Sequence, residues 1–193
     1  MLKRVAVVIL ASFFVACSLA ETKIYSLYVP RDQAAGDTRA ALSLAIHIDS
    51  PRYLAQPYIA YRNSPYQLTI SKYSKWDASP GDIVKDVLRD AFSSSGPFRD
   101  VRLSHAVPTG FYLLSVNLKK FELLETAEGP FGEMEFDAVL FSPDNKEIYH
   151  RTISKRPKLD DKTFVSLAKG LSKGLAEGVN EVKSGIAGAV PAL

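Results

Sequence analysis

Cys17 is the residue of this chain with the clearest chemical potential, because it is the only thiol among 193 residues. It stands at the end of the apolar stretch RVAVVILASFFVACSLA. Lys3 and Arg4 give the N-terminus a positive charge, whereas the 12 residues 5–16 carry none. As a helix this run would be about 18 Å long, while the hydrocarbon core of a bilayer is about 30 Å thick. The run is therefore too short to span a membrane, and the pattern predicts a secretory signal peptide.

A thiol directly after small residues, at the end of such a run, is typical of a bacterial lipoprotein signal, in which the cysteine sulfur receives a diacylglycerol. Val15-Ala16-Cys17 follows this lipobox pattern, with Phe14 where Leu is most common. The alternative is an ordinary signal peptide cut after Ala16 or Ala20, which would leave a free cysteine. We favour lipidation at Cys17, since a lone thiol in an exported chain can form unwanted disulfides and several acyl chains give a stable anchor.

The rest of the chain has the composition of one domain. Cleavage before Cys17 makes residues 1–16 the signal peptide and leaves 177 residues: a lipid-anchored spacer at 17–24, a domain at 25–186 and a flexible tail at 187–193. Loss of Lys3 and Arg4 lowers the net charge from +3 to +1, so nothing suggests binding to nucleic acid. Ser18, in a position where Asp favours the inner membrane of enterobacteria, favours the outer membrane. We expect a lipid-anchored protein that faces the periplasm.

No pattern in the domain points to catalysis. The three histidines lie far apart in the sequence and lack the spacing of metal ligands: His47, His105 and His150. Acidic residues alternate along one predicted strand, where paired carboxylates could do acid–base work, but such a row is usually a solvated face: Glu133, Glu135 and Asp137. Neither a nucleophile elbow nor a phosphate-binding loop is present in the sequence. We therefore expect no catalytic residue, metal ion or cofactor, and no motif supports the possibility of a hydrolase.

Strand and helix patterns predict an α/β fold. ALSLAIHID, at residues 41–49, alternates as a half-buried strand, and residues 57–70 form a hairpin that turns at Asn63-Ser64-Pro65. A helix begins after Ser79, with Asp82 at the position of a capping-box acid. Three further strands form an antiparallel meander, the first with a β-bulge near Lys119-Lys120: residues 112–125, 132–142 and 147–155. We predict a single domain with a mostly antiparallel sheet and two main helices packed on one of its faces.

The last predicted helix, at residues 162–183, contains three glycines at intervals of four: Gly170, Gly174 and Gly178. Each glycine destabilises a helix by about 1 kcal/mol relative to alanine. A compensating gain is expected from the close approach of another element, either the sheet or a second helix. The three glycines are therefore candidate interface residues.

Aromatic residues are dense in the hairpin region, where five of nine tyrosines fall within 21 positions and Trp76 follows: Tyr53, Tyr58, Tyr61, Tyr66 and Tyr73. Either these rings pack the hairpin onto the helix at 83–92, or part of the set contacts a second copy or a partner protein. Strand alternation places Tyr61 inward with Ile59 and Tyr58 outward. Tyr58 is therefore a further candidate interface residue.

The region from the signal to the first helix carries a recognisable set of residues: Cys17, Tyr25-Ser26-Leu27, Pro51-Arg52-Tyr53-Leu54, Pro57, Ile59, Arg62 and Trp76. This pattern resembles the ABC-type transport auxiliary lipoprotein family, of the paraquat-inducible protein C type. The family pattern has a Y-x-L strand soon after the lipidated cysteine, then P-R-Y-L-x-x-P-x-I-x-x-R, then a hairpin that ends in tryptophan before a helix. The spacer after Cys17 is shorter here than in the family pattern.

The resemblance implies an outer-membrane lipoprotein without catalytic activity. Its partners would be an MCE-domain protein and an inner-membrane ABC permease, which together move lipids or other hydrophobic molecules across the bacterial envelope, and the chain could form a homo-oligomer. The alternative is a periplasmic carrier that holds a hydrophobic ligand between sheet and helices. A pocket of several hundred Å3 would favour the carrier, and a packed core would count against it.

Overall fold

The computed structural model describes residues 21–30, 42–94, 96–104 and 108–190. The signal peptide, Cys17 and His105 lie outside these residues. The described chain forms one eight-stranded sheet and two helices. In chain order they are β1 (Lys23–Tyr25), β2 (Leu42–Asp49), β3 (Tyr58–Ser64), β4 (Gln67–Trp76), α2 (Pro80–Ser94), β5 (Phe98–Leu103), β6 (Tyr112–Thr126), β7 (Gly129–Phe141), β8 (Glu147–Lys155) and α3 (Phe164–Ala189).

The sheet is mixed, so the prediction of a mostly antiparallel sheet is wrong. The meander of β6, β7 and β8 and the hairpin of β3 and β4 are antiparallel, as expected. The remaining four of the seven pairings are parallel: β1 with β4, β2 with β5, β2 with β6, and β3 with β6. Parallel strands are joined by long crossovers, and these leave no local pattern in the sequence, whereas hairpins do.

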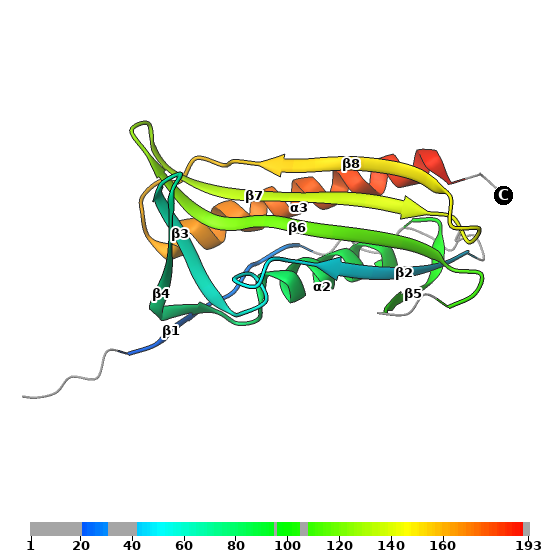
Figure 1. Cartoon of the computed structure of the whole chain (residues 1–193), viewed down its shortest axis with the longest axis horizontal. Helices are drawn as coiled ribbons and strands as arrows, with labels where there is room; N and C mark the ends of the chain where they lie inside the picture. The colour runs from blue at the N-terminus through cyan, green and yellow to red at the C-terminus, as the bar shows by residue number, and fades with distance from the viewer. Residues whose placement is uncertain (1–20, 31–41, 95, 105–107, 191–193) are drawn as a thin grey trace, which may run out of the picture.

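Strand β6 is the centre of the sheet, and the sheet forks along one edge of β6, where two different strands pair with it in turn. On one side β6 pairs with β7 along nearly its whole length. On the other side residues 112–117 of β6 pair with β2, and residues 122–124 pair with β3. The predicted bulge, between Leu118 and Lys120, lies between these two pairings. Because a bulge bends a strand, β3 and β4 leave the sheet at a steep angle to β6 and form an arm at one end of the molecule (Figure 1).

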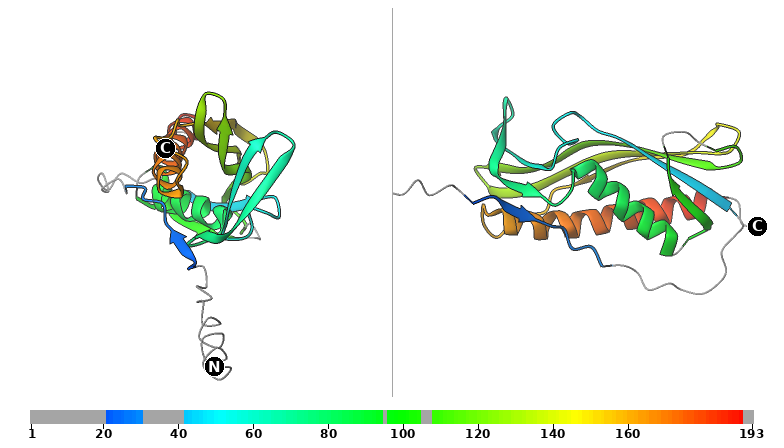
Figure 2. Two further views of the ribbon diagram at one scale, coloured as in Figure 1. Left: turned by 90° about the vertical axis from the view of Figure 1, so that its left-hand side faces the viewer. Right: turned by 90° about the horizontal axis from the view of Figure 1, so that it is seen from below.

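Both helices lie on the same face of the sheet, behind the strands in Figure 1 and below the long strands in the right-hand view of Figure 2. The predicted cap of α2 is present: the Ser79 hydroxyl oxygen accepts a hydrogen bond from the Asp82 N–H at 3.2 Å and donates to the Asp82 carboxylate at 2.7 Å. Helix α3 begins after Thr163, whose hydroxyl oxygen accepts from the Ser166 N–H. Each helix has an apolar stripe at helical spacing, and both stripes are buried against the sheet.

Two predicted boundaries differ from the structure. Strand β1 covers Lys23–Tyr25, so it begins within the segment predicted to be a spacer, and it pairs in parallel with the end of β4. Helix α3 continues to Ala189, which is three residues into the segment predicted to be a flexible tail. Ile186, in the last turns of the helix, is fully buried, and this burial explains why the helix extends past the small residues near its end.

Candidate functional site

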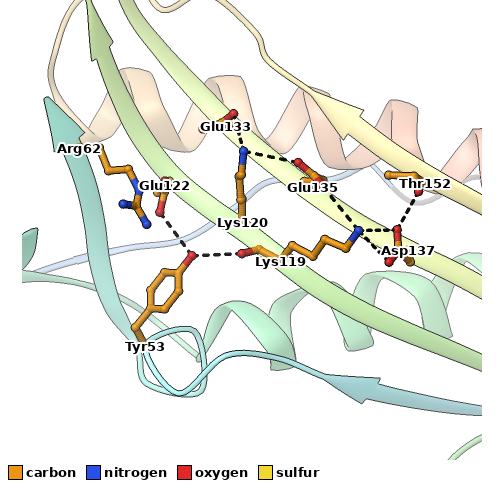
Figure 3. Close-up of polar contacts among 9 residues, drawn as sticks. All are labelled: Tyr53, Arg62, Lys119, Lys120, Glu122, Glu133, Glu135, Asp137 and Thr152. Atoms are coloured by element: carbon orange, nitrogen blue, oxygen red, sulfur yellow. Dashed lines mark hydrogen bonds and ion pairs between the residues drawn. The ribbon is translucent and has the colours of Figure 1, made fainter. Parts of the chain in front are cut away.

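The fork of the sheet holds the most buried charge of the described chain. Glu122, on β6, is only 1% exposed and accepts a hydrogen bond from Arg62 Nε of β3 at 2.6 Å. Tyr53, in the connection between β2 and β3, donates from its hydroxyl toward the Lys119 carbonyl at 3.1 Å and toward Glu122 at 3.4 Å (Figure 3). Residues far apart in the sequence thus meet at the bulge. We call Tyr53, Arg62 and Glu122 the fork cluster.

Two groups of the fork cluster, Tyr53 and Arg62, have shifted pKa values. Burial, assisted by the negative charge of Glu122, raises the pKa of Tyr53 to about 12, so its hydroxyl remains a donor at neutral pH. The hydrogen bond to Glu122 raises the pKa of Arg62. A buried carboxylate with a cation and a second donor has its charge compensated. The cluster therefore has the chemistry of a structural joint between β3 and β6.

A row of ion pairs continues from the fork between β6 and β7, and Thr152 of β8 donates a hydrogen bond to Asp137 at its end (Figure 3). Lys119 contacts Asp137 at 2.8 Å and Glu135 at 3.6 Å, and Lys120 contacts Glu133 at 3.1 Å. The hydrogen bond from Lys119 lowers the pKa of Asp137, and the same contact raises the pKa of Lys119. The acids predicted to lie on a solvated face are in fact half-buried in ion pairs. Asp137, whose pKa is lowered, remains ionised at neutral pH and is a poor general acid.

The family-like motif in residues 51–62 has a structural role at most of its positions. Leu54 and Ile59 are fully buried. The Pro51 carbonyl accepts a hydrogen bond from the Leu54 N–H, and the Pro57 carbonyl accepts one from the Trp76 N–H at 2.7 Å. Tyr53 and Arg62 of the motif contact Glu122 at the fork, and Glu122 is not among the residues predicted from the sequence. The only available signal was a single acid in an otherwise apolar run after the two lysines.

The three predicted interface glycines face β8 and the segment after it, within the same chain. A Cβ at Gly178 would lie 2.8 Å from Ile153 Cγ2, one at Gly174 would lie 3.2 Å from Lys155 Cβ, and one at Gly170 would lie 2.5 Å from Leu159 Cδ2. The structure therefore places the glycines against the sheet, which is the first of the two neighbours considered. Their small size allows α3 to lie close to β8.

The ring contact that a hairpin tyrosine makes within the described residues is with α3. Tyr61 packs against Phe164 of α3, with the ring centroids 6.4 Å apart. Tyr58 is half-buried rather than exposed, and Lys75 Nζ lies 5.2 Å from its ring centroid. Tyr66 and Tyr73 are exposed, at 96% and 54%. The exposed rings of the arm are therefore those of β4 and of the turn before it.

A groove of about 370 Å3 lies between the two helices and the segment after β1. Its apolar lining includes Leu27, Val87 and Val179, and three carboxylates also line it: Asp77, Asp86 and Asp90. Arg89 bridges the last two, at 3.1 and 3.2 Å. The volume is at the lower end of the range for ligand sites. The carboxylates would repel a phosphate headgroup, so the groove suits a neutral or cationic apolar group.

Among the described residues, no three side chains of His, Cys, Asp or Glu are arranged to hold a metal ion. His47 contacts Asp49 at 3.3 Å, and His150 contacts Glu147 at 3.6 Å. In the part of the chain that the structure describes, no helix is both long and apolar enough to cross a membrane.

Comparison with known protein families decides the membership of the chain. The model of the ABC-type transport auxiliary lipoprotein component family matches residues 25–183, which include the fork, the arm, α2 and all but the last six residues of α3. The chain belongs to this family. The resemblance predicted from residues 17–76 is thereby confirmed, and the family match extends it to residue 183.

Two of the matching solved structures share this fold at low sequence identity. A Xanthomonas campestris protein of family DUF330 is 21% identical, with a TM-score of 0.72 over 86% of this chain and 96% of its own. An uncharacterized protein is 17% identical, with a TM-score of 0.67 over 86% of this chain and 99% of its own. PelC from Paraburkholderia phytofirmans, a dodecamer, is 14% identical, with a TM-score of 0.44 over 79% of this chain and 95% of its own. Comparison with curated protein sequences finds no significant match.

Proposed function

We propose that this chain is an outer-membrane lipoprotein that faces the periplasm and serves as a non-catalytic accessory component of an ABC transport system of the MCE type. The system would move lipids or other hydrophobic molecules across the bacterial envelope. The observation that carries the proposal is the family match over residues 25–183, combined with Cys17 at the end of a signal-peptide pattern. Ser18 after the cysteine favours the outer membrane.

The geometry of the domain supports an accessory role. The acids and bases of the exposed sheet face are held in ion pairs, and the fork cluster fixes the arm to β6. A lipid tether would raise the local concentration of the domain at one membrane without any further contact. We therefore expect the domain to hold a binding surface for an MCE-domain partner in the periplasm, close to the membrane that carries the lipid anchor.

The alternative, a lipid-binding carrier, has one observation in its favour, which is the groove between α2, α3 and the segment after β1. The groove is not between sheet and helices, where the carrier hypothesis expected it. That space is filled by fully buried side chains such as Leu88, Phe136 and Leu175. The carboxylates of the groove also disfavour phospholipids. We therefore favour the accessory role.

The test begins with the anchor and continues to the partner. Intact-mass analysis of the purified protein should give the mass of the chain that begins at Cys17 plus its acyl groups, and a Cys17→Ser variant should remain unprocessed or be released from the outer membrane. Affinity purification from detergent-solubilised envelope, followed by mass spectrometry, should recover an MCE-domain protein. An unmodified thiol would contradict the anchor, whereas an acylated protein without any MCE-domain partner would contradict only the transport role.

A further inference from the structure

Large apolar side chains that remain exposed are concentrated at one end of the molecule. Six such residues occur in the described chain, and five of them lie on β1, the β3–β4 arm or the first turn of α3. They are between 38% and 96% exposed: Ile24, Tyr66, Ile70, Tyr73 and Val165. We call these five the end patch. Scattered exposed apolar residues are normal, but a group that gathers on one end marks a contact surface.

The elements that carry the end patch are neighbours in space. Strand β1 pairs with residues 74–76 of β4, and Tyr25 of β1 contacts Phe164 at the start of α3, with ring centroids 5.9 Å apart. Tyr61, on the arm, contacts the same Phe164 ring. The figures show the start of β1, the arm and the start of α3 together at the left-hand end, opposite the turn between β7 and β8 (Figures 1 and 2).

The path of the chain connects this end to the predicted anchor. Only six residue steps separate Lys23, the first residue of β1, from Cys17. Fully extended, six residues span at most about 20 Å. A lipid on Cys17 would therefore place the bilayer within about 20 Å of β1. The far end of the molecule, where β7 turns into β8, cannot be brought closer to the bilayer than this end without folding the linker back along the domain.

The charge of the same elements suits a membrane surface. Strands β1, β3 and β4 contain no acidic residue, and apart from Arg62, which Glu122 neutralises, they carry three lysines: Lys23, Lys72 and Lys75. Lysines near a bilayer are attracted by anionic headgroups, and tyrosines favour the interface between headgroups and acyl chains. Apolar, aromatic and basic side chains together are the composition of a surface that lies on a bilayer.

We propose that the end patch is a second membrane contact, which lies on the bilayer that holds the Cys17 lipid and fixes the orientation of the domain. This inference rests on the lipid anchor of the proposed function. The occupant is the lipid surface itself, through its interfacial region and its anionic headgroups. The acyl chains of Cys17 already hold the domain stably at the bilayer. The end patch adds a fixed orientation, in which the ends of α3 and β6 opposite the patch point away from the membrane.

A single-cysteine experiment tests the proposal, because acylation of Cys17 would leave the natural chain without a free thiol. Tyr66→Cys and Val165→Cys place probes in the end patch, and Asp144→Cys, in the exposed turn between β7 and β8, is the matched control at the opposite end. Each full-length lipoprotein is labelled with a nitrobenzoxadiazole fluorophore and reconstituted in vesicles of phosphatidylethanolamine with a minor share of phosphatidylglycerol. Emission wavelength and quenching by aqueous iodide are then measured.

We expect the two patch probes to shift to shorter wavelength on reconstitution, and their iodide quenching constants to fall several-fold below that of the Asp144→Cys probe. Protection should be independent of the number of proteins per vesicle. Patch probes that are quenched as strongly as the control overturn the proposal while leaving the anchor intact. Protection that disappears as the protein is diluted in the membrane overturns it in favour of contact with a second copy. An unmodified Cys17 by intact mass removes the anchor, and with it the basis of this inference.

Discussion

Replacing Arg62 with methionine tests whether the fork cluster joins the arm to the sheet. Methionine keeps an unbranched apolar side chain but removes the guanidinium group, so Glu122 loses the donor that lies 2.6 Å from its carboxylate. Tyr53, at 3.4 Å, is a weak remaining partner. Glu122 is 1% exposed, so water does not reach it in the native structure. The variant would leave a buried carboxylate without its cation.

The expected magnitude follows from this geometry. Removing one partner of a fully buried ion pair destabilises a protein by about 3–5 kcal/mol. The Arg62 side chain is 27% exposed, so its loss opens a path for water to Glu122. We therefore expect the lower limit, about 3 kcal/mol.

Urea denaturation followed by tryptophan fluorescence provides the assay. Trp76 is the only tryptophan, is 2% exposed and packs edge-to-face on Phe121, next to Glu122 in β6. The matched control is Arg102→Met, whose side chain is exposed and pairs with the exposed Asp100, and it should change stability by less than about 1 kcal/mol. The double variant Arg62→Met/Glu122→Met should recover most of the loss. Two results would refute the reasoning: an Arg62→Met variant as stable as the control, or a double variant no better than the single one.

Three further predictions concern other parts of the fold. The pKa of Tyr53 is raised to about 12, so its contribution to stability is complete below about pH 10 and is lost as the pH rises toward 12. The Tyr53→Phe variant should lack this loss of stability at alkaline pH, measured as the urea midpoint over a series of pH values. Gly178→Ala should destabilise the domain by about 1–3 kcal/mol, because the added Cβ would lie 2.8 Å from Ile153 Cγ2. The control Gly188→Ala has open space around the added Cβ and should stabilise the domain by up to about 1 kcal/mol. Equal effects of the two substitutions in thermal unfolding would contradict the close packing of α3 on β8. Tyr61→Ala should lower the melting temperature because it removes the contact between the Tyr61 and Phe164 rings, and an unchanged melting temperature would contradict a packing role for Tyr61.

Local patterns in the sequence predicted the elements that depend on local physics. The cap at Ser79, the stripe of α3 and the meander of β6 to β8 follow from hydrogen bonds or periodicity within a few residues. The bulge near Lys119-Lys120 was predicted from the change of apolar phase in a single strand. These features need no information about distant parts of the chain.

The parallel pairings and the fork cluster could not be predicted in this way. Strand β3 pairs with β6 across about 60 residues, and nothing near Arg62 in the sequence indicates that its partner is Glu122. Tyr58 shows the same limit: alternation alone places it outward, but Lys75, which β4 brings opposite it, covers part of the ring. Alternation identifies two faces of a strand and does not say what covers each of them.

The position of the family-like motif links the fold to the proposed role. Tyr53 and Arg62 reach the bulge of β6, and the carbonyl of Pro57 receives the Trp76 N–H, so the motif fixes both the base of the arm and the end of β4. Strand β1 pairs with this end of β4, and β1 begins six residue steps after Cys17. A motif that sets the angle of the arm therefore also sets the position of the exposed tyrosines relative to the predicted lipid. This gives a physical reason for buried, charge-compensated residues in a protein that we propose has no chemistry to perform: they determine which surface the anchored domain presents to the membrane and which it presents to a partner.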